Sequence, residues 1–128
     1  MINRAPILFY TKKQGSIETS SFGSELTAMK TAVELIEGLR YKLQMMGVPL
    51  DRPTHVFADN MYVVHNCSNP ASQLKKKSNS IAYHYVRERC AMDSVLIEHV
   101  RTEDNLADAL TKSQPAVVRK SLVSRVLY

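Results

Sequence analysis

The sequence predicts an α/β protein in which helices flank a mixed β-sheet. Two short apolar runs, THVFA at 54–58 and SVLIEHV at 94–100, have the length and composition of strands buried in such a sheet. Longer runs around them repeat apolar residues every three or four positions, as amphipathic helices do. The chain has 128 residues, of which 45% are hydrophobic, which is enough for a hydrophobic core. We therefore expect a single domain over 1–128.

The N-terminal part is predicted to form a β-hairpin followed by a long helix. Residues 6–13 are apolar and aromatic and end at Gln14-Gly15, a turn signal, and residues 16–22 alternate like a second strand. The helix is expected to open at Gly23-Ser24 with Ser24 as its N-cap. Gly47, followed by a proline, is expected to end it.

The remaining elements follow from the same kinds of pattern. Pro70 separates two predicted helices that precede the second buried strand, and Pro115 separates two that follow it. The predicted helices after the first buried strand cover residues 61–67, 77–91, 105–112 and 116–127, the last of them basic and amphipathic. An antiparallel hairpin followed by strand–helix units implies a mixed sheet.

Composition narrows the function classes. No run approaches the ~18 apolar residues of a membrane span, and the N-terminus lacks the pattern of a secretory signal, so we expect an intracellular protein that is not secreted. Cys67 and Cys90 have no zinc-type spacing, which suggests a reducing compartment. The formal net charge is +5, with basic clusters at Lys12-Lys13 and Lys75-Lys76-Lys77. Such clusters attract phosphates, although they can also be simple solvated surface.

Three widely spaced carboxylates stand at predicted element ends: Glu25 at a helix start, Asp59 after a buried strand, and Asp108 early in a helix. Carboxylates from such ends could ligate two Mg²⁺ roughly 3.5–4 Å apart. Two of these acids also have a plainer explanation, whereas Asp108, inside an apolar helical segment, is less easily explained because an exposed position would serve solubility just as well. Glu25 could complement a helix dipole, and Asp59 with Asn60 could form a turn or an N-cap. Asp104 and Asn105 are better explained as caps than as ligands.

Four stretches together resemble a known family. They are TKKQGSIETSSFGSELTAMK, the strand end ADN, KKKSNSIAYHYVRE and VRTEDNLADALTK, in this order. They look like the ribonuclease H domain that follows the reverse transcriptase in Ty1/copia-type retrotransposon Pol polyproteins. The match covers about 5–112, and 113–128 would be a C-terminal basic helix. The resemblance implies a ribonuclease H-like sheet flanked by helices.

The resemblance also implies an activity. Glu25, Asp59 and Asp108 match the second, third and fourth acids of the family's metal site. That site hydrolyses the RNA strand of an RNA–DNA hybrid with two Mg²⁺, for which Mn²⁺ can substitute. Expected partners are the hybrid and the upstream reverse-transcriptase domain, in a cytoplasmic virus-like particle or in the nucleus. Candidate nucleic-acid contacts are Lys12, Lys13, Asn60, Tyr62, Lys75, Lys76 and Lys77. Tyr62 could instead pack on its own helix, and helix packing is the expected role of His84.

Two departures from the family pattern qualify this activity. The family's first acid lies on a strand upstream of the hairpin, and the printed sequence begins after it. We therefore expect a sheet without its first, central strand, and a chain that is weak or inactive alone. Ser78-Asn79-Ser80 also stands where the family usually has His-Ile-Asp. The alternatives are a catalytically inactive, truncated or domesticated remnant that only binds nucleic acid, or a fragment whose sheet edges pair with another protein.

Overall fold

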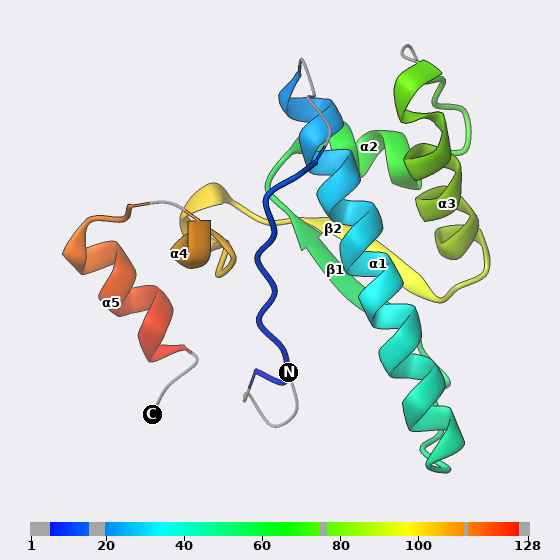
Figure 1. Ribbon diagram of the computed structural model, residues 1–128, viewed down its shortest axis with the longest axis horizontal. Helices are drawn as coiled ribbons and strands as arrows, with labels where there is room; N and C mark the ends of the chain where they lie inside the picture. Colours follow the sequence, from blue (N-terminus) through cyan, green and yellow to red (C-terminus); the bar gives the residue numbers. More distant parts are fainter. Residues whose placement is uncertain (1–5, 16–19, 75–76, 112, 126–128) are drawn as a thin grey trace. The chain divides into compact units, whose positions relative to one another are not determined.

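The computed structural model describes residues 6–15, 20–74, 77–111 and 113–125 and has an α/β fold (Figure 1). Its contacts divide the chain into two compact units. One comprises Ile17–His99 and is called the helix–strand unit below; the other comprises Met1–Ser16 with Val100–Tyr128 and is called the terminal unit. The elements in chain order are α1 (Ser21–Met45), β1 (Thr54–Ala58), α2 (Met61–Ser68), the 3-10 turn η1 (Lys77–Asn79), α3 (Ser80–Ala91), β2 (Val95–His99), the 3-10 turn η2 (Thr102–Asp104), α4 (Asp108–Thr111) and α5 (Ala116–Ser124).

Strands β1 and β2 pair in parallel, with Thr54 opposite Val95 and Ala58 opposite His99. They are the only strands among the described residues. Helices α2 and α3 connect them, as a parallel pair requires. Alternate side chains point to opposite faces, so Val56 is buried whereas Phe57 is exposed. The strands predicted at 54–58 and 94–100 are thus confirmed, as is the α/β class, which is compatible with a ribonuclease H-like fold lacking strands.

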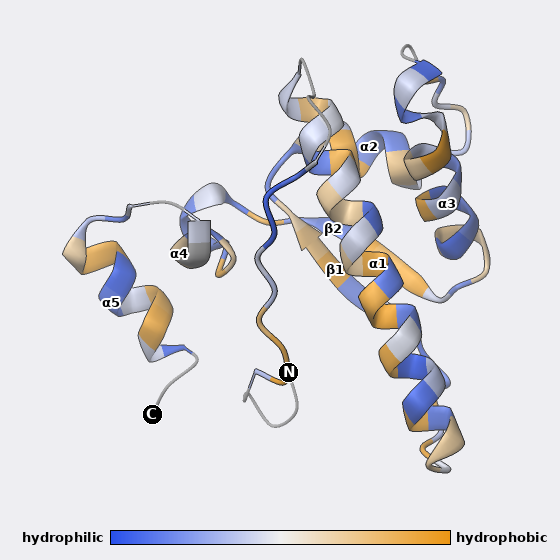
Figure 2. Cartoon of the chain, viewed as in Figure 1, coloured by the Kyte–Doolittle hydropathy of each residue, from blue (hydrophilic) through white to orange (hydrophobic). Residues whose placement is uncertain are grey.

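The core of the helix–strand unit lies between the inner face of this sheet and helices α1, α2 and α3. Each helix contributes apolar residues at helical spacing, and hydrophobic residues are interspersed with hydrophilic ones around α1 (Figure 2). Burial of these side chains supplies the main favourable free energy of folding for the unit. The core residues are Leu26, Met29, Val33, Val56, Val63, Cys67, Tyr83, Val86, Val95 and Ile97.

Helix α1 has well-defined ends. The hydroxyl of Ser20 accepts a hydrogen bond from the Gly23 N–H at 3.3 Å, so Ser20 is the N-cap. At the other end Gly47 has φ 80°, and its N–H and that of Val48 donate to carbonyls of the last helical turn at 2.9 and 3.0 Å. This is a Schellman ending, which favours glycine because the left-handed conformation strains other residues. Gly47 therefore ends the helix as predicted, whereas the prediction of Ser24 as N-cap was wrong.

The predicted N-terminal hairpin is not formed by the described residues. Residues 6–13 have no regular secondary structure, and Ser21 and Phe22 belong to α1 rather than to a strand. Phe22 packs against the core, which the earlier helix start makes possible. Residues 16–19 of the predicted second strand lie outside the described residues. Strand formation depends on a partner strand more than on composition, so an apolar run alone is weak evidence for it.

The segment predicted as one helix over 105–112 is also more broken than expected. The side-chain oxygen of Asn105 accepts a hydrogen bond from the Ala107 N–H at 3.1 Å, forming an Asx turn that delays the helix to Asp108. Helix α5 begins at Ala116, as predicted. Among the residues described, no helix combines the length and the apolar character needed to cross a membrane.

Candidate acidic site and nucleic-acid interface

Asp59 lies at the carboxyl end of β1, where the chain turns into α2. Because β2 runs parallel to β1, both strands end at the same edge of the sheet. In open α/β sheets, ligands bind at this edge. The Asp59 side chain is half-buried. Its position is therefore the one that a ligand-binding carboxylate would occupy in this class of fold.

Asn60, next to Asp59, is the N-cap of α2. Its side-chain oxygen accepts hydrogen bonds from the backbone N–H groups of Tyr62 at 2.9 Å and Val63 at 3.4 Å. The capping alternative thus applies to Asn60, and its side-chain NH₂ is the group left for a phosphate. Tyr62 is 76% exposed, which favours an accessible ring over one packed on its own helix.

Glu25 lies in the second turn of α1, because the helix begins four residues earlier at Ser21. The expectation that it stands in the first turn was wrong. The helix dipole acts mainly within the first turn, so complementing the dipole is not a sufficient explanation for Glu25. It is half-buried, and its neighbour Leu26 and Met29 one turn on are both in the core. The packing of Leu26 and Met29 in the core thus fixes the helix backbone around Glu25.

Asp108 is the first residue of α4 and only 5% of its surface is exposed. Its N–H donates to the Asn105 carbonyl at 3.2 Å. Burial of a carboxylate is costly unless polar groups or cations surround it. A role in solubility is excluded for so buried a side chain. Asn105 forms the turn before it, in agreement with the expected capping role.

The three acids are divided between the two units: Glu25 and Asp59 belong to the helix–strand unit, and Asp108 belongs to the terminal unit. Carboxylate oxygens are the hard ligands that Mg²⁺ prefers, so the donor chemistry suits the predicted metal. Within the described part of the chain, however, no three His, Cys, Asp or Glu side chains are grouped so that they could hold a metal ion. The predicted pair of Mg²⁺ ions therefore stays a prediction.

The lysines that were predicted to contact nucleic acid are likewise distributed between the two units. Lys12 and Lys13 are exposed in the irregular segment 6–15 of the terminal unit. Lys77 is exposed at the start of η1, in the helix–strand unit. Lys75 and Lys76 lie outside the described residues. The exposed lysines have the accessibility that phosphate contacts require.

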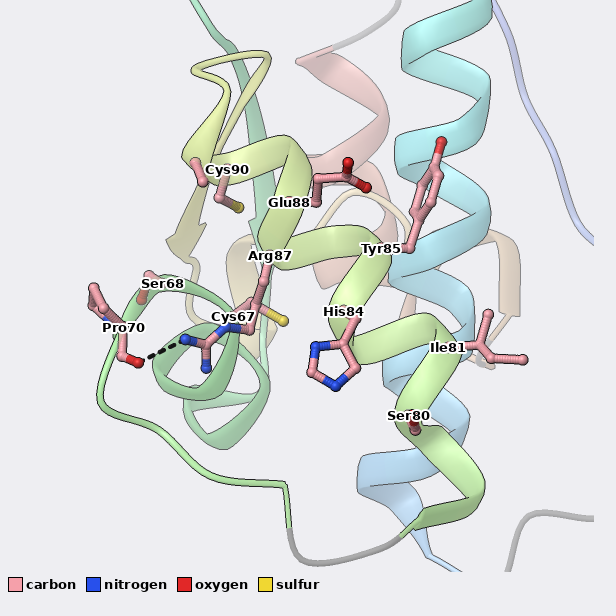
Figure 3. Close-up of a pocket in the computed structure, with 11 residues that line it drawn as sticks. Cys67, Ser68, Pro70, Ser80, Ile81, His84, Tyr85, Arg87, Glu88 and Cys90 are labelled. Atoms are coloured by element: carbon pink, nitrogen blue, oxygen red, sulfur yellow. Dashed lines mark hydrogen bonds between the residues drawn. The ribbon is translucent and has the colours of Figure 1, made fainter.

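An open groove of about 930 Å³ lies along α3 and the end of α2 (Figure 3). Its lining includes Cys67, Ile81, His84, Tyr85, Glu88 and Cys90. His84 is exposed there and lies edge-on to the ring of Tyr83, its neighbour on α3, at a centroid distance of 5.2 Å. Figure 3 shows Arg87 reaching from α3 to Pro70 beside this groove. No local pattern in the sequence marks Arg87, because the backbone carbonyls that it binds lie 15 to 21 residues away.

The two cysteines of the groove are poor nucleophiles. Burial raises the pKa of the Cys67 thiol to about 12, and the nearby Cys90 adds to this effect. Burial also raises the pKa of Cys90, although the Arg87 guanidinium acts in the opposite direction. A thiol reacts as its thiolate, so a raised pKa makes both side chains unreactive near neutral pH. The groove is therefore not a site of cysteine catalysis.

Comparison with known proteins gives the class of protein to which this α/β chain is similar: the retrovirus-related Pol polyproteins of transposons. No family model matches the chain, and neither does any solved structure.

Two particular relatives are polyproteins of Arabidopsis thaliana. The chain is 28% identical over 121 residues, or 94% of its length, to the retrovirus-related Pol polyprotein from transposon RE1. It is 29% identical over 107 residues, or 84% of its length, to that from transposon RE2. These matches cover 8% and 7% of the two polyproteins, so the chain spans less than a tenth of the length of either relative.

Proposed function

We propose that the chain is the ribonuclease H module of a copia-type retroelement Pol polyprotein, which hydrolyses the RNA strand of RNA–DNA hybrids during reverse transcription. The observation that carries the proposal is the similarity to transposon Pol polyproteins over 84–94% of the chain. The location of Asp59 at the carboxyl end of a parallel strand supports it further. The sequence resemblance to the ribonuclease H part of such polyproteins specifies the activity.

In this proposal the chain's own residues have distinct tasks. Glu25, Asp59 and Asp108 contribute carboxylate ligands, and Mg²⁺ bound there would supply an activated water and charge stabilisation of the leaving oxygen. Asn60 fixes the start of α2 beside Asp59. The exposed Tyr62 and the lysines at 12, 13 and 77 contact the sugar–phosphate backbone. Such contacts recognise duplex shape and 2′-hydroxyl groups rather than base sequence.

The test is cleavage of an RNA–DNA hybrid by the chain and by the chain joined to the reverse-transcriptase segment of its polyprotein. Asp59→Asn and Asp108→Asn should each reduce cleavage by at least about 100-fold, because a neutral amide is a poor ligand for Mg²⁺. Asp51→Asn is the matched control, since Asp51 is exposed on the loop after α1. It should leave the rate unchanged.

Retention of cleavage in either Asp59→Asn or Asp108→Asn would refute the site assignment. Double-stranded DNA serves as the substrate control, and it should not be cut. Equal cleavage of hybrid and double-stranded DNA would contradict the proposed substrate.

A second candidate function is binding of nucleic acid without cleavage, as in an inactive or domesticated remnant. It is favoured by the net charge of +5 and the exposed lysines at 12, 13 and 77, which suit phosphate contacts whether or not cleavage follows. In that case hybrid binding persists in EDTA, weakens steeply with salt, and gives no product with Mg²⁺. Product formation that depends on Asp59 excludes this candidate.

A further inference from the structure

The segment that forms α2 and the turn after it has no formally charged side chain. Residues 60–72 contain no Asp, Glu, Lys or Arg. They include Asn60, Tyr62, His65 and Asn69, whose side chains carry hydrogen-bond donors. Neutral donors of this kind bind phosphate oxygens and sugars, and no carboxylate of the segment repels a phosphate. The segment directly follows Asp59 of the candidate acidic site (Figure 1).

Tyr62 and His65 share the exposed face of α2. They are three residues apart, so they are neighbours on the helix surface, about 4.5 Å apart along its axis. Both side chains are exposed, whereas Val63 and Cys67 of the same helix are buried in the core. A ligand that reaches the ring of Tyr62 can therefore also reach the imidazole of His65.

Asn69 determines which nitrogen of His65 is protonated. The Asn69 side-chain oxygen accepts from the Ala71 N–H at 2.9 Å, so its NH₂ group is the one that faces Nε2 of His65, at 3.3 Å. An amide NH₂ can only donate. Nε2 is therefore the acceptor, and the neutral imidazole carries its proton on Nδ1. Among the described residues Nδ1 has no hydrogen-bond partner, so His65 presents one N–H donor to a ligand.

A local network holds Asn69 in this orientation. The Asn69 N–H donates to the His65 carbonyl at 3.0 Å, and the Asn69 carbonyl accepts from the Ser72 N–H at 3.1 Å. The Ser72 hydroxyl in turn donates to the side-chain oxygen of Asn66 on α2. These bonds form within residues 65–72, so the imidazole is oriented before any ligand arrives. A donor that is already oriented loses less entropy on binding.

We propose that His65 binds the RNA–DNA hybrid: its Nδ1–H donates to a phosphate oxygen beside the backbone contact of Tyr62, and Asn69 is the positioning residue that keeps the proton on Nδ1. This inference rests on the proposed function, because it concerns the same substrate. The contact is made to the backbone, so it is independent of base sequence.

Two variants of His65 distinguish the ring nitrogens. The side-chain nitrogen of asparagine is as many bonds from the backbone as Nδ1 of histidine, and that of glutamine is as many as Nε2. Binding of a labelled hybrid is measured in EDTA at pH 8, where free imidazole is neutral. His65→Gln should bind at least about fivefold more weakly, because a hydrogen bond to a charged group is lost. His65→Asn should stay within about twofold of the parent chain.

The salt dependence of the same measurement gives a second readout. The slope of log affinity against log salt should be the same in the parent chain and in His65→Gln, because a neutral donor releases no counterion. His84→Gln is the matched control. His84 is also an exposed histidine on a helix of the helix–strand unit, but it lies in the groove along α3. Its replacement should leave hybrid affinity unchanged.

Nitrogen NMR of the imidazole tests the role of Asn69 directly. At pH 8 the His65 ring of the parent chain should be protonated on Nδ1. Asn69→Ala removes the donor to Nε2, so the ring should shift towards the Nε2-protonated form, and hybrid binding should weaken. A purely structural role of Asn69 would not change the tautomer.

Hybrid affinity of His65→Gln equal to that of the parent chain, or equal losses in His65→Gln and His65→Asn, would overturn the Nδ1 contact and leave the proposed function intact. A parent ring protonated on Nε2 would overturn the positioning role of Asn69 and the Nδ1 contact together. Failure of the parent chain to bind the hybrid would contradict the proposed function as well as this inference.

Discussion

Asn79 is a polar side chain in an apolar position. It is only 4% exposed, and its side-chain nitrogen has no hydrogen-bond partner among the described residues. It stands at the N-cap of α3 but makes no side-chain cap hydrogen bond. A buried polar group left without a partner costs about 1–3 kcal/mol. This residue is therefore a weak point of the helix–strand unit.

We predict that Asn79→Leu stabilises the chain by about 1 kcal/mol or more, because the unsatisfied amide is removed from the interior. Denaturant unfolding followed by circular dichroism measures the change. Asn69→Leu is the control: the Asn69 side chain is hydrogen-bonded in a turn, so its loss should destabilise. A decrease in stability for Asn79→Leu would show that the Asn79 amide is satisfied in the folded protein.

The buried thiols give a second residue-scale prediction. Since the pKa of Cys67 is raised from 9.0 to about 12, folding favours its neutral form. This contribution to stability is complete below pH 9 and is lost as the pH rises from there towards 12. At pH 8, a disulfide reagent such as DTNB should modify the half-buried Cys90 slowly and Cys67 only after unfolding. Cys90→Ser isolates Cys67, and rapid labelling of that folded variant would contradict the prediction.

At the scale of elements, one carboxylate ties the end of α5 to the turn η2. Asp104 accepts hydrogen bonds from Arg125 at 2.9 Å and from Arg101 at 2.8 and 3.0 Å. These cations lower the pKa of Asp104, the Arg125 hydrogen bond most. All three residues belong to the terminal unit. The expected capping role of Asp104 is thus replaced by ion pairing with two arginines.

We predict that Asp104→Asn increases hydrogen exchange in α5 at neutral pH, because the ionic contacts with Arg125 and Arg101 are lost. In the parent chain the same loosening should appear in acid. A lowered pKa means that the stabilisation is present above the ordinary value of 3.8 and is lost as the pH falls through the lower folded value. Glu103→Gln, which affects one exposed ion pair with Arg101 at 3.2 Å, should have little effect. Equal protection of α5 in parent and Asp104→Asn would refute the role of this ion pair.

Elements defined by local signals were predictable from the sequence. The apolar run 54–58 matches β1 at both ends, and Gly47 ends α1 because only a residue tolerant of positive φ suits that turn. The start of α1 was missed because several hydroxyl residues could cap it, and packing of Phe22 selects Ser20. The prediction of a strand at 6–13 was wrong because strand formation is decided by pairing with a neighbouring strand. Composition does not encode that pairing.

At the scale of the whole molecule, the candidate site was predictable only in part. The position of Asp59 after a buried strand follows from local pattern, and the burial of Asp108 agrees with its setting in an apolar segment. The hydrogen bonds from Arg87 to the carbonyls of Pro70 and Ser72 could not be foreseen, since these backbone groups are distant from Arg87 in sequence. The grouping of Glu25, Asp59 and Asp108 around one metal site is likewise a tertiary property, and it stays a prediction.

The central claim is that this chain cuts the RNA strand of a hybrid. The most direct measurement uses one RNA–DNA hybrid labelled separately on each strand, incubated with the chain joined to its reverse-transcriptase segment, with Mg²⁺ or with EDTA. We expect fragments from the RNA strand only, with Mg²⁺ only, and none when Asp59 is changed to Asn. Cleavage of the DNA strand, cleavage in EDTA, or an intact RNA strand under all conditions would contradict it.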